Sequence, residues 1–179
     1  MPDGIASEEI FHMKIGDKVS VSGPAGRLIL LEESLHPKRY VLVATGTGVT
    51  PYRSMLNQID TITKTHDIKF LLLFGVRTPQ ECLYYDEFLN IKRNNKNFDF
   101  HVFYSRELPV NTDPTLTYEN THIHHGYVQT GFEKIKLDPN TDMIYLCGNP
   151  NMIDDAYPML LTKGFTARNV RREKYISSK

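Results

Sequence analysis

Residues 41–51 read VLVATGTGVTP, a stretch in which an apolar run leads through two glycines to a proline. The apolar, β-branched run is typical of a strand that is covered on both faces of a parallel sheet. Gly46 and Gly48 lack a Cβ, so backbone N–H groups at this turn can approach an anion closely. Pro51 suits the first position of a helix, where aligned N–H groups favour negative charge. The stretch predicts an α/β fold with a cradle for a dinucleotide pyrophosphate.

Two glycines alone are also compatible with an ordinary strand-to-helix turn of an α/β protein. Pro51 stands where the common dinucleotide fingerprint has its third glycine. The sequence therefore argues against a nucleotide site of the common NAD dehydrogenase kind.

Composition excludes several classes of function. The chain has 179 residues, of which 21 are basic and 21 acidic, so it lacks the positive net charge expected of a nucleic-acid-binding protein. Its longest apolar run, residues 70–74, is too short to cross a membrane. Cys82 and Cys147 form no C-x-x-C motif, which disfavours a disulfide framework or a thiolate metal site. We expect a monomeric, cytoplasmic protein that inserts into no membrane and holds no metal.

The first 36 residues have a pattern of their own. Residues 15–26 read as a turn, an alternating strand and a second turn, and residues 27–31 read as another short strand. These are typical of the last strands of an antiparallel barrel, and they are too few to bury a face by themselves. We expect residues 1–36 to be the end of a barrel whose beginning is missing, and residues 37–179 to form an α/β domain.

Strands and helices alternate in the second part. We predict strands at residues 40–44, 68–76, 98–104, 143–147 and 169–176, and helices at residues 51–63, 84–93, 126–135 and 150–161. The last helix is expected to be capped by Asn149 and kinked near Pro158. This alternation predicts a five-stranded parallel sheet between two helical layers, with a ligand at the carboxyl ends of the strands.

The motifs at those strand ends resemble, in the same order, motifs of the ferredoxin–NADP reductase family. TGTGVTP (45–51) is similar to the family's T-G-T-G-x-x-P turn, and FGVRT (74–78) with LYYDEF (83–88) resembles its second strand and helix. SRE (105–107), YVQT (127–130) and CG (147–148) resemble its S-R-E, Y-I-Q-T and C-G motifs. The resemblance covers nearly the whole chain. It implies an FAD-dependent oxidoreductase in which this chain supplies the NADP-binding half, with ferredoxin or flavodoxin as the electron partner.

The resemblance also assigns cofactor-binding residues. Ser105 and Arg106 are expected to read the NADP 2′-phosphate, because a hydroxyl beside a guanidinium suits a dianion. Tyr127 is expected to stack on adenine with Gln129 beside it, and Arg77 either reaches the same phosphate or forms a surface salt bridge. The remaining assigned residues are those of the phosphate turns and one from a G-x-x-S-like segment that meets the flavin pyrophosphate: Thr45, Gly46, Thr47, Gly48, Pro51, Gly148 and Ser7.

Three residues are candidate catalytic residues by the same resemblance. Cys147 would lie against the nicotinamide, Tyr175 would cover the flavin ring and yield to the nicotinamide, and Glu173 would lie near the reacting atoms. The hydride chemistry itself belongs to NADP and FAD. Read without the resemblance, Cys147 is a small buried hydrophobe, and Glu173 and Tyr175 belong to a surface strand.

Several alternatives stay open at this point. The family's arginine-tyrosine-serine flavin motif is absent, so we expect the chain alone not to hold FAD. It would then be a nucleotide-binding module without activity of its own, or the reductase component of a multi-component oxygenase. His122, His124 and His125 have no carboxylate or cysteine partners nearby in sequence and are not expected to bind metal. The basic residues of the C-terminal segment either form a solvated face or steer an acidic carrier: Arg168, Arg171, Arg172 and Lys174.

Overall fold

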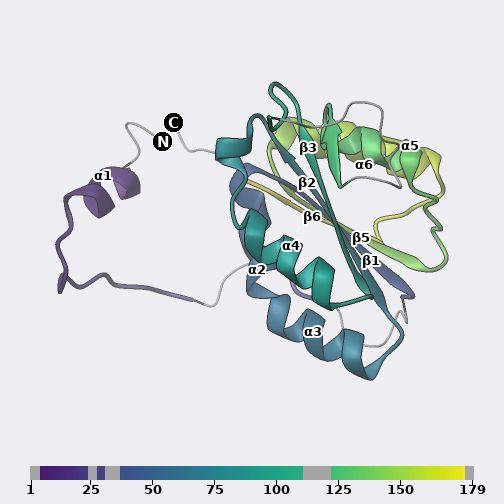
Figure 1. The fold of residues 1–179 in the computed structure, drawn as a ribbon, viewed down its shortest axis with the longest axis horizontal. Helices are drawn as coiled ribbons and strands as arrows, with labels where there is room; N and C mark the ends of the chain where they lie inside the picture. Colours follow the sequence, from purple (N-terminus) through teal and green to yellow (C-terminus); the bar gives the residue numbers. More distant parts are fainter. Residues whose placement is uncertain (1–4, 24–27, 31–36, 111–121, 176–179) are drawn as a thin grey trace.

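The computed structural model describes residues 5–23, 28–30, 37–110 and 122–175. At its centre lies one sheet (Figure 1), which has six strands, all parallel. Their order across the sheet is β4-β3-β2-β1-β5-β6. The strands are β1 (Arg39–Thr45), β2 (Lys69–Val76), β3 (Phe98–Tyr104), β4 (Ile123–His125), β5 (Asp142–Gly148) and β6 (Val170–Lys174). The chain moves outward from β1 to β4 and then returns to the other side of β1. This reversal creates a switch point between β1 and β5, where parallel sheets bind ligands.

Helices cover both faces of the sheet. Helices α2 (Thr50–Ser54), α3 (Leu56–Thr65) and α4 (Tyr85–Asn94) lie on one face, and α5 (Gly131–Lys134) and α6 (Pro150–Thr162) lie on the other (Figure 1). Short 3₁₀ turns occur at η2 (Gly46–Val49), η3 (Pro79–Glu81) and η4 (Val128–Thr130). Within the described ranges, no helix is long and apolar enough to cross a membrane. The three-layer arrangement that the alternation predicted is confirmed.

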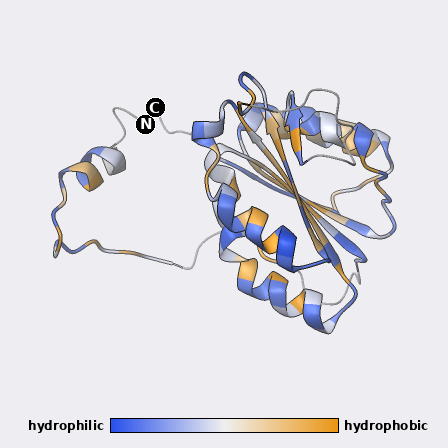
Figure 2. Ribbon diagram, in the orientation of Figure 1, coloured by the Kyte–Doolittle hydropathy of each residue, from blue (hydrophilic) through white to orange (hydrophobic). Residues whose placement is uncertain are grey.

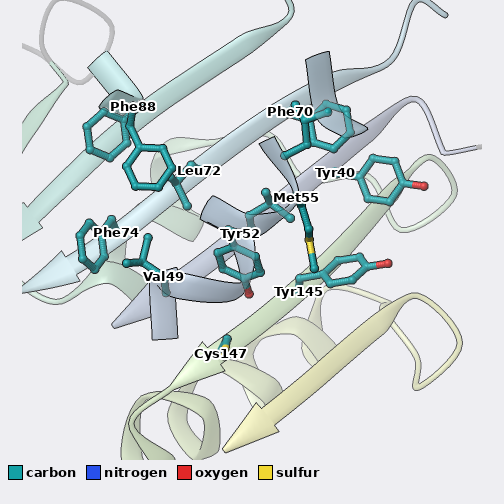
Figure 3. Packing of buried hydrophobic residues seen from close by; sticks show 14 of the residues in the cluster. Tyr40, Val49, Tyr52, Met55, Phe70, Leu72, Phe74, Phe88, Tyr145 and Cys147 are labelled. Atoms are coloured by element: carbon teal, nitrogen blue, oxygen red, sulfur yellow. The ribbon is translucent and has the colours of Figure 1, made fainter. Parts of the chain in front are cut away.

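Two apolar clusters hold the layers together. On the α2–α4 face, Tyr52 and Met55 pack against the sheet (Figure 3). The Tyr52 hydroxyl donates to the Val43 carbonyl at 3.1 Å. On the other face, Phe132 and Ile153 are fully buried against the strands. Hydropathy follows this division, with apolar residues along the strands and polar residues on the outer sides of the helices (Figure 2). Each apolar group removed from water stabilises the fold by about 25 cal/mol per Å² of buried surface.

The five predicted strands are present, but the prediction of a five-stranded sheet is wrong. The sixth strand, β4, has three residues and pairs with residues 102–104 of β3. Its sequence, Ile-His-His, carries no apolar run or clear alternation. The hydrogen bonds to β3, rather than local propensity, make it a strand.

Two helix predictions need correction. The helix predicted over residues 51–63 occurs as α2 and α3, which meet at Met55, whose N–H points to the carbonyls of both Pro51 and Tyr52. The helix predicted over residues 126–135 is confined to η4 and α5. Gly126 has φ +120° and Tyr127 is extended, so neither continues a helix. The predicted cap is confirmed, since the Asn149 side chain accepts from the Asn151 N–H at 2.8 Å.

The predicted barrel strands are wrong for the N-terminal residues that the structure describes. Residues 5–12 form the helix α1 (Ile5–His12), and residues 15–23 contain no strand (Figure 1). Val19 and Val21 alternate with serines as expected but are 64% and 87% exposed, because no neighbouring strand pairs with them. Leu28 and Leu30 instead pack into the core of the α/β domain. Residues 24–27 and 31–36, which completed the barrel prediction, lie outside the described residues.

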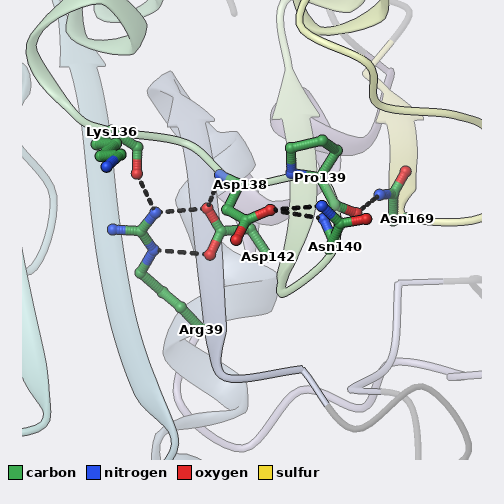
Figure 4. Close-up of polar contacts among 7 residues, drawn as sticks. All are labelled: Arg39, Lys136, Asp138, Pro139, Asn140, Asp142 and Asn169. Atoms are coloured by element: carbon green, nitrogen blue, oxygen red, sulfur yellow. Dashed lines mark hydrogen bonds and ion pairs between the residues drawn. The ribbon is translucent and has the colours of Figure 1, made fainter.

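A charged network closes the amino end of the sheet between β1 and β5 (Figure 4). The Arg39 guanidinium donates from Nε to Asp142 Oδ1 at 3.0 Å and from Nη2 to the Lys136 carbonyl at 2.7 Å. Asp142 is buried and also accepts from the Asp138 N–H at 2.8 Å. The buried carboxylate is therefore fully paired, and its partners come from positions far apart in the chain.

Replacing Asp142 with asparagine is expected to lower the free energy of unfolding by about 1.5–3 kcal/mol, because charge-assisted hydrogen bonds to Arg39 are lost in a buried site. Urea unfolding followed by circular dichroism measures this change. Asp60→Asn is the control, since its exposed pair with Lys64 on α3 is expected to contribute no more than about 0.5 kcal/mol. Equal losses in the two variants would contradict the role of burial.

Candidate functional site

A groove of about 850 Å³ lies at the carboxyl ends of the central strands, at the switch point. Ten residues predicted from the sequence line it: Thr45, Gly46, Thr47, Arg77, Ser105, Arg106, Tyr127, Gln129, Gly148 and Tyr175. They come from the carboxyl ends of all six strands, and the first and last of them, Thr45 and Tyr175, are 130 positions apart in the chain. The topology of the sheet brings them together, as the alternation of strands and helices predicted.

The turn after β1 presents two glycines in different roles. Gly46 has φ +53°, is exposed in the groove, and has open space where a Cβ would stand. Gly48 is buried, and a Cβ there would lie 2.4 Å from the Cys147 carbonyl oxygen. Gly48 therefore permits a close approach of the turn to the end of β5, a packing role that the sequence analysis did not predict.

The ends of β1 and β5 are tied to each other. The Asn149 N–H donates to Thr45 Oγ1 at 2.9 Å. Gly148 has φ +127°, and a Cβ there would lie 2.5 Å from both the carbonyl oxygen and the hydroxyl of Thr45. The Thr45 hydroxyl therefore helps to fix the loop that begins α6, and the N-terminus of this 13-residue helix opens at the groove.

Charged residues gather where β2 and β3 end. The Arg106 N–H donates to the Arg77 carbonyl at 3.0 Å, which holds the two loops side by side. The Arg77 guanidinium pairs with Glu81, with 2.9 Å between Nε and Oε2, and Glu81 also lines the groove. Arg77 and Arg106 both lower the pKa of the Glu81 carboxyl. The salt-bridge alternative for Arg77 is thus the one observed, whereas the Arg106 side chain makes no hydrogen bond or ion pair with the described residues.

An exposed aromatic ring forms the rim of the groove beside these charges. Tyr127 is 68% exposed, whereas its neighbour Val128 is buried. Val128 packs so closely on β2 that a Cβ at Gly75 would lie 2.9 Å from its Cβ. This contact fixes η4 on the sheet and leaves the Tyr127 ring as a flat surface facing solvent. Gln129 lines the groove and donates from Nε2 to Asp155 Oδ2 at 3.3 Å.

The three candidate catalytic residues lie where β5 and β6 end, and only Tyr175 among them lines the groove. Cys147 is fully buried at the end of β5, and burial raises the pKa of its thiol to about 11 despite a hydrogen bond with Tyr175. Tyr175 is about one-third exposed, and its N–H donates to the Gly148 carbonyl at 2.9 Å. Glu173 pairs in register with Cys147 on β6 but does not line the groove. The thiol is protonated near neutral pH, so the site offers no cysteine nucleophile.

Five predicted residues do not line the groove. Gly48 and Cys147 are buried beneath its floor, Glu173 lies on the edge strand, Pro51 is the second residue of α2, and Ser7 is exposed on α1. Sequence reasoning missed other lining residues, among them Glu81, Asn151, Met152 and Asp155. Glu81 carried a signal, its position four residues after Arg77 at the same strand end. The lining residues of α6 had no such signal, because the sequence does not say which side of the helix's first turns faces the groove.

The histidines near β4 form contacts with aromatic and polar neighbours. His101 and His124 stack with 5.0 Å between ring centroids, and His101 Nδ1 lies 2.7 Å from His124 Nε2. The other nitrogen of His101 is bonded to Asp99, whose second partner is Lys92. Among the described residues, no group of histidine, cysteine and acidic side chains is arranged to hold a metal ion.

Acid is expected to weaken the β3–β4 edge. Burial and the neighbouring His101 lower the pKa of His124 to about 4, below its usual 6.5. Between these values the unfolded chain binds a proton that the folded chain does not, so the free energy of unfolding falls as pH drops from about 6.5 to about 4. We expect His124→Phe to reduce this decline, as measured by urea unfolding at several pH values. An unchanged pH dependence in the variant would assign the decline to other groups.

Comparison with known proteins identifies the fold. The family model "Oxidoreductase NAD-binding domain" matches residues 42–157. A mutant ferredoxin–NADP⁺ reductase from Plasmodium falciparum, solved with 2′P-AMP, matches with a TM-score of 0.72 and 23% identity over 96% of this chain and 66% of that one. The CS-b5R domains of human Ncb5or, in the NAD⁺ form, match with a TM-score of 0.73 and 21% identity over 96% of this chain and 46% of that one.

Curated relatives match at higher identity. One subunit of the Na⁺-translocating NADH-quinone reductase of Klebsiella pneumoniae is 32% identical over 174 residues, which are 94% of this chain and 40% of that protein. The root isozyme 2 of chloroplastic ferredoxin–NADP reductase from Arabidopsis thaliana is 32% identical over 160 residues, 84% of this chain and 39% of that protein. The chain thus spans about two-fifths of the length of these relatives.

Proposed function

Because the chain belongs to the oxidoreductase NAD-binding domain family of ferredoxin–NADP-reductase-like proteins, we propose that it binds NADP(H) as the nucleotide half of an FAD-dependent reductase. The observation that carries this proposal is the groove, because three features suited to a nucleotide line it together. They are the open turn at Gly46, the guanidinium of Arg106, which has no partner among the described residues, and the exposed ring of Tyr127. These features suit a pyrophosphate, a 2′-phosphate and an adenine respectively.

Each part of the nucleotide has a proposed partner. The N–H groups of the turn at Gly46 and Thr47 receive the pyrophosphate, helped by the N-terminus of α6. Ser105 and Arg106 hold the 2′-phosphate, because the guanidinium supplies parallel donors and the hydroxyl supplies one more. Tyr127 stacks on the adenine ring.

The nicotinamide is proposed to lie at the Tyr175 end of the groove. Tyr175 covers the buried Cys147 and makes its own backbone bond to Gly148. A side chain held by one strand end can move aside when the nicotinamide enters, whereas Cys147 limits the depth of the pocket. Bound NADPH supplies a hydride, for which FAD in the complete reductase is the proposed acceptor. Glu173 lies on the neighbouring strand, and its proposed role is to place a negative charge near the reacting rings.

The partners of the complete reductase belong to this proposal as well. Ferredoxin or flavodoxin is the proposed one-electron carrier, the proposed location is the cytoplasm, and the proposed state is a monomer. The Arabidopsis relative, named a ferredoxin–NADP reductase, supports the carrier. The basic segment of β6 and the preceding turn is proposed to attract an acidic carrier, with Arg172 lying 3.7 Å from the ring centre of Tyr157 and Arg168 exposed.

A second candidate is a reductase component that uses NADH. Glu81 favours it, because this carboxylate lies in the groove, occupies Arg77 and would repel a 2′-phosphate. The relatives include the reductase component of a propane 2-monooxygenase from Rhodococcus jostii, 27% identical over 165 residues. The two candidates differ in the nucleotide that binds more tightly.

Isothermal titration calorimetry of the 179-residue chain with NADP⁺, NAD⁺ and 2′-phospho-AMP tests the proposal. We expect NADP⁺ and 2′-phospho-AMP to bind and NAD⁺ to bind at least about tenfold more weakly, in line with the loss of one charge-assisted contact. Tighter binding of NAD⁺ would favour the second candidate. Binding of none of the three would overturn both.

A further inference from the structure

Gln129 and Asp155 meet at the end of the groove beside the exposed ring of Tyr127. Gln129 belongs to η4 and Asp155 to α6, so the contact joins two separate elements across the groove. Gln129 Nε2 donates to Asp155 Oδ2 at 3.3 Å. The neighbouring Asp154 instead pairs with Lys174 at 2.6 Å and does not line the groove. Among the described residues, the hydrogen bond from Gln129 is the polar contact of the Asp155 side chain.

A carboxylate can only accept hydrogen bonds, whereas an amide has an accepting oxygen and a nitrogen with two donors. Asp155 therefore fixes which way the Gln129 amide faces. The reversed amide would place its oxygen against the carboxylate, where two acceptors repel each other. In the favoured orientation, the amide oxygen and the second N–H of Gln129 remain available to a ligand as one acceptor next to one donor.

Adenine presents the complementary pair. Its N6 amino group donates and the adjacent ring nitrogen accepts, which is the pattern that a glutamine amide recognises with two hydrogen bonds. Hypoxanthine and guanine carry an oxygen in place of the amino group and would set an acceptor against the amide oxygen. We propose that Asp155 is a positioning residue that orients Gln129, so that the groove selects adenine dinucleotides over those with a 6-oxopurine base. This inference rests on the proposed function, which places the base at Tyr127.

The test compares NADP⁺ with its hypoxanthine analogue, nicotinamide hypoxanthine dinucleotide phosphate, by calorimetry on the full chain. The wild-type chain is expected to bind NADP⁺ on the order of tenfold more tightly. In Asp155→Asn the new amide can also donate, so Gln129 can face either way, and the ratio of the two dissociation constants is expected to fall to within about twofold of one. Asp155→Glu keeps an acceptor-only partner for Gln129, so this variant is expected to retain the preference for NADP⁺. Gln129→Ala is expected to abolish that preference.

Asp154→Asn is the matched control, because it removes the same charge from the adjacent position of α6 without touching Gln129. It is expected to leave the ratio at the wild-type value. Equal affinities for the two nucleotides in the wild-type chain, or an unchanged ratio in Asp155→Asn, would overturn the inference while leaving nucleotide binding intact. If the wild-type chain binds neither nucleotide, the proposed function itself fails and this inference falls with it.

Discussion

Replacing Gly48 with valine is expected to lower the free energy of unfolding by at least about 3 kcal/mol, since the new side chain meets backbone that cannot rotate away. A Cβ at this position lies 2.4 Å from the carbonyl oxygen of Cys147 and 2.6 Å from the Cα of Gly148. The turn must then separate from β5, and the cradle opens with it. Denaturant unfolding measures the stability, and calorimetry with NADP⁺ is expected to detect no binding.

Gly46→Ala separates the two roles of the turn. A Cβ at Gly46 meets nothing within 4 Å, so the expected loss of stability is only about 1–2 kcal/mol, from the left-handed backbone at φ +53°. Because Gly46 lines the groove, nucleotide affinity is expected to fall more than stability does. A Gly48→Val chain as stable as Gly46→Ala would show that the turn is not packed on β5 as described.

Replacing Arg106 with alanine is expected to remove most of a preference for NADP⁺ over NAD⁺. The side chain is exposed at the end of β3 and has no partner among the described residues, so its donors are available to a phosphate. Losing a charge-assisted contact costs about 1.5–3 kcal/mol, which corresponds to roughly a 10- to 100-fold weaker binding of NADP⁺. The affinity for NAD⁺, which lacks the 2′-phosphate, is expected to change little.

Arg168→Ala serves as the control for net charge, because this exposed arginine lies outside the groove. It is expected to leave the ratio of the NADP⁺ and NAD⁺ dissociation constants unchanged. If Arg106→Ala weakens the binding of both nucleotides by the same factor, the guanidinium contacts the pyrophosphate or contributes only to the electrostatic potential of the groove. The assignment to the 2′-phosphate would then be wrong.

The sequence predicted the parallel sheet well because its strands are apolar runs covered on both sides. Residues 41–44 and 70–74 are short, continuous apolar runs, which are typical of strands buried on both faces of a parallel sheet. Such strong local patterns favour this fold over an antiparallel sheet with one exposed face. The positions of Gly46, Ser105, Arg106 and Tyr127 followed from the same prediction. Once the strands are parallel, the loops after them must meet at one edge of the sheet.

The errors arose where structure depends on partners distant in sequence. Strand β4 forms because it pairs with β3, and its sequence, Ile-His-His, has no apolar run or alternation that would predict a strand. The alternation at Val19 and Val21 was correct as a pattern, but a strand also needs a neighbour to pair with. The packing role of Gly48 was missed for a similar reason, because the Cys147 carbonyl that a Cβ there would meet is about 100 residues away in the chain.

The pairing of β1 with β5 has a consequence for the order in which the protein folds. The two strands are adjacent in the sheet but separated by about 100 residues, and both the Arg39–Asp142 pair and the bond from the Asn149 N–H to Thr45 span that separation. Closing so long a loop is entropically expensive, so the β1–β5 contact is expected to form late. Strands β1–β3 can associate earlier through shorter connections. The ability to bind a nucleotide is therefore expected to appear only in the final, cooperative step of folding. In a refolding experiment, the recovery of nucleotide binding would then mark the completion of the sheet, whereas the association of β1–β3 would precede it.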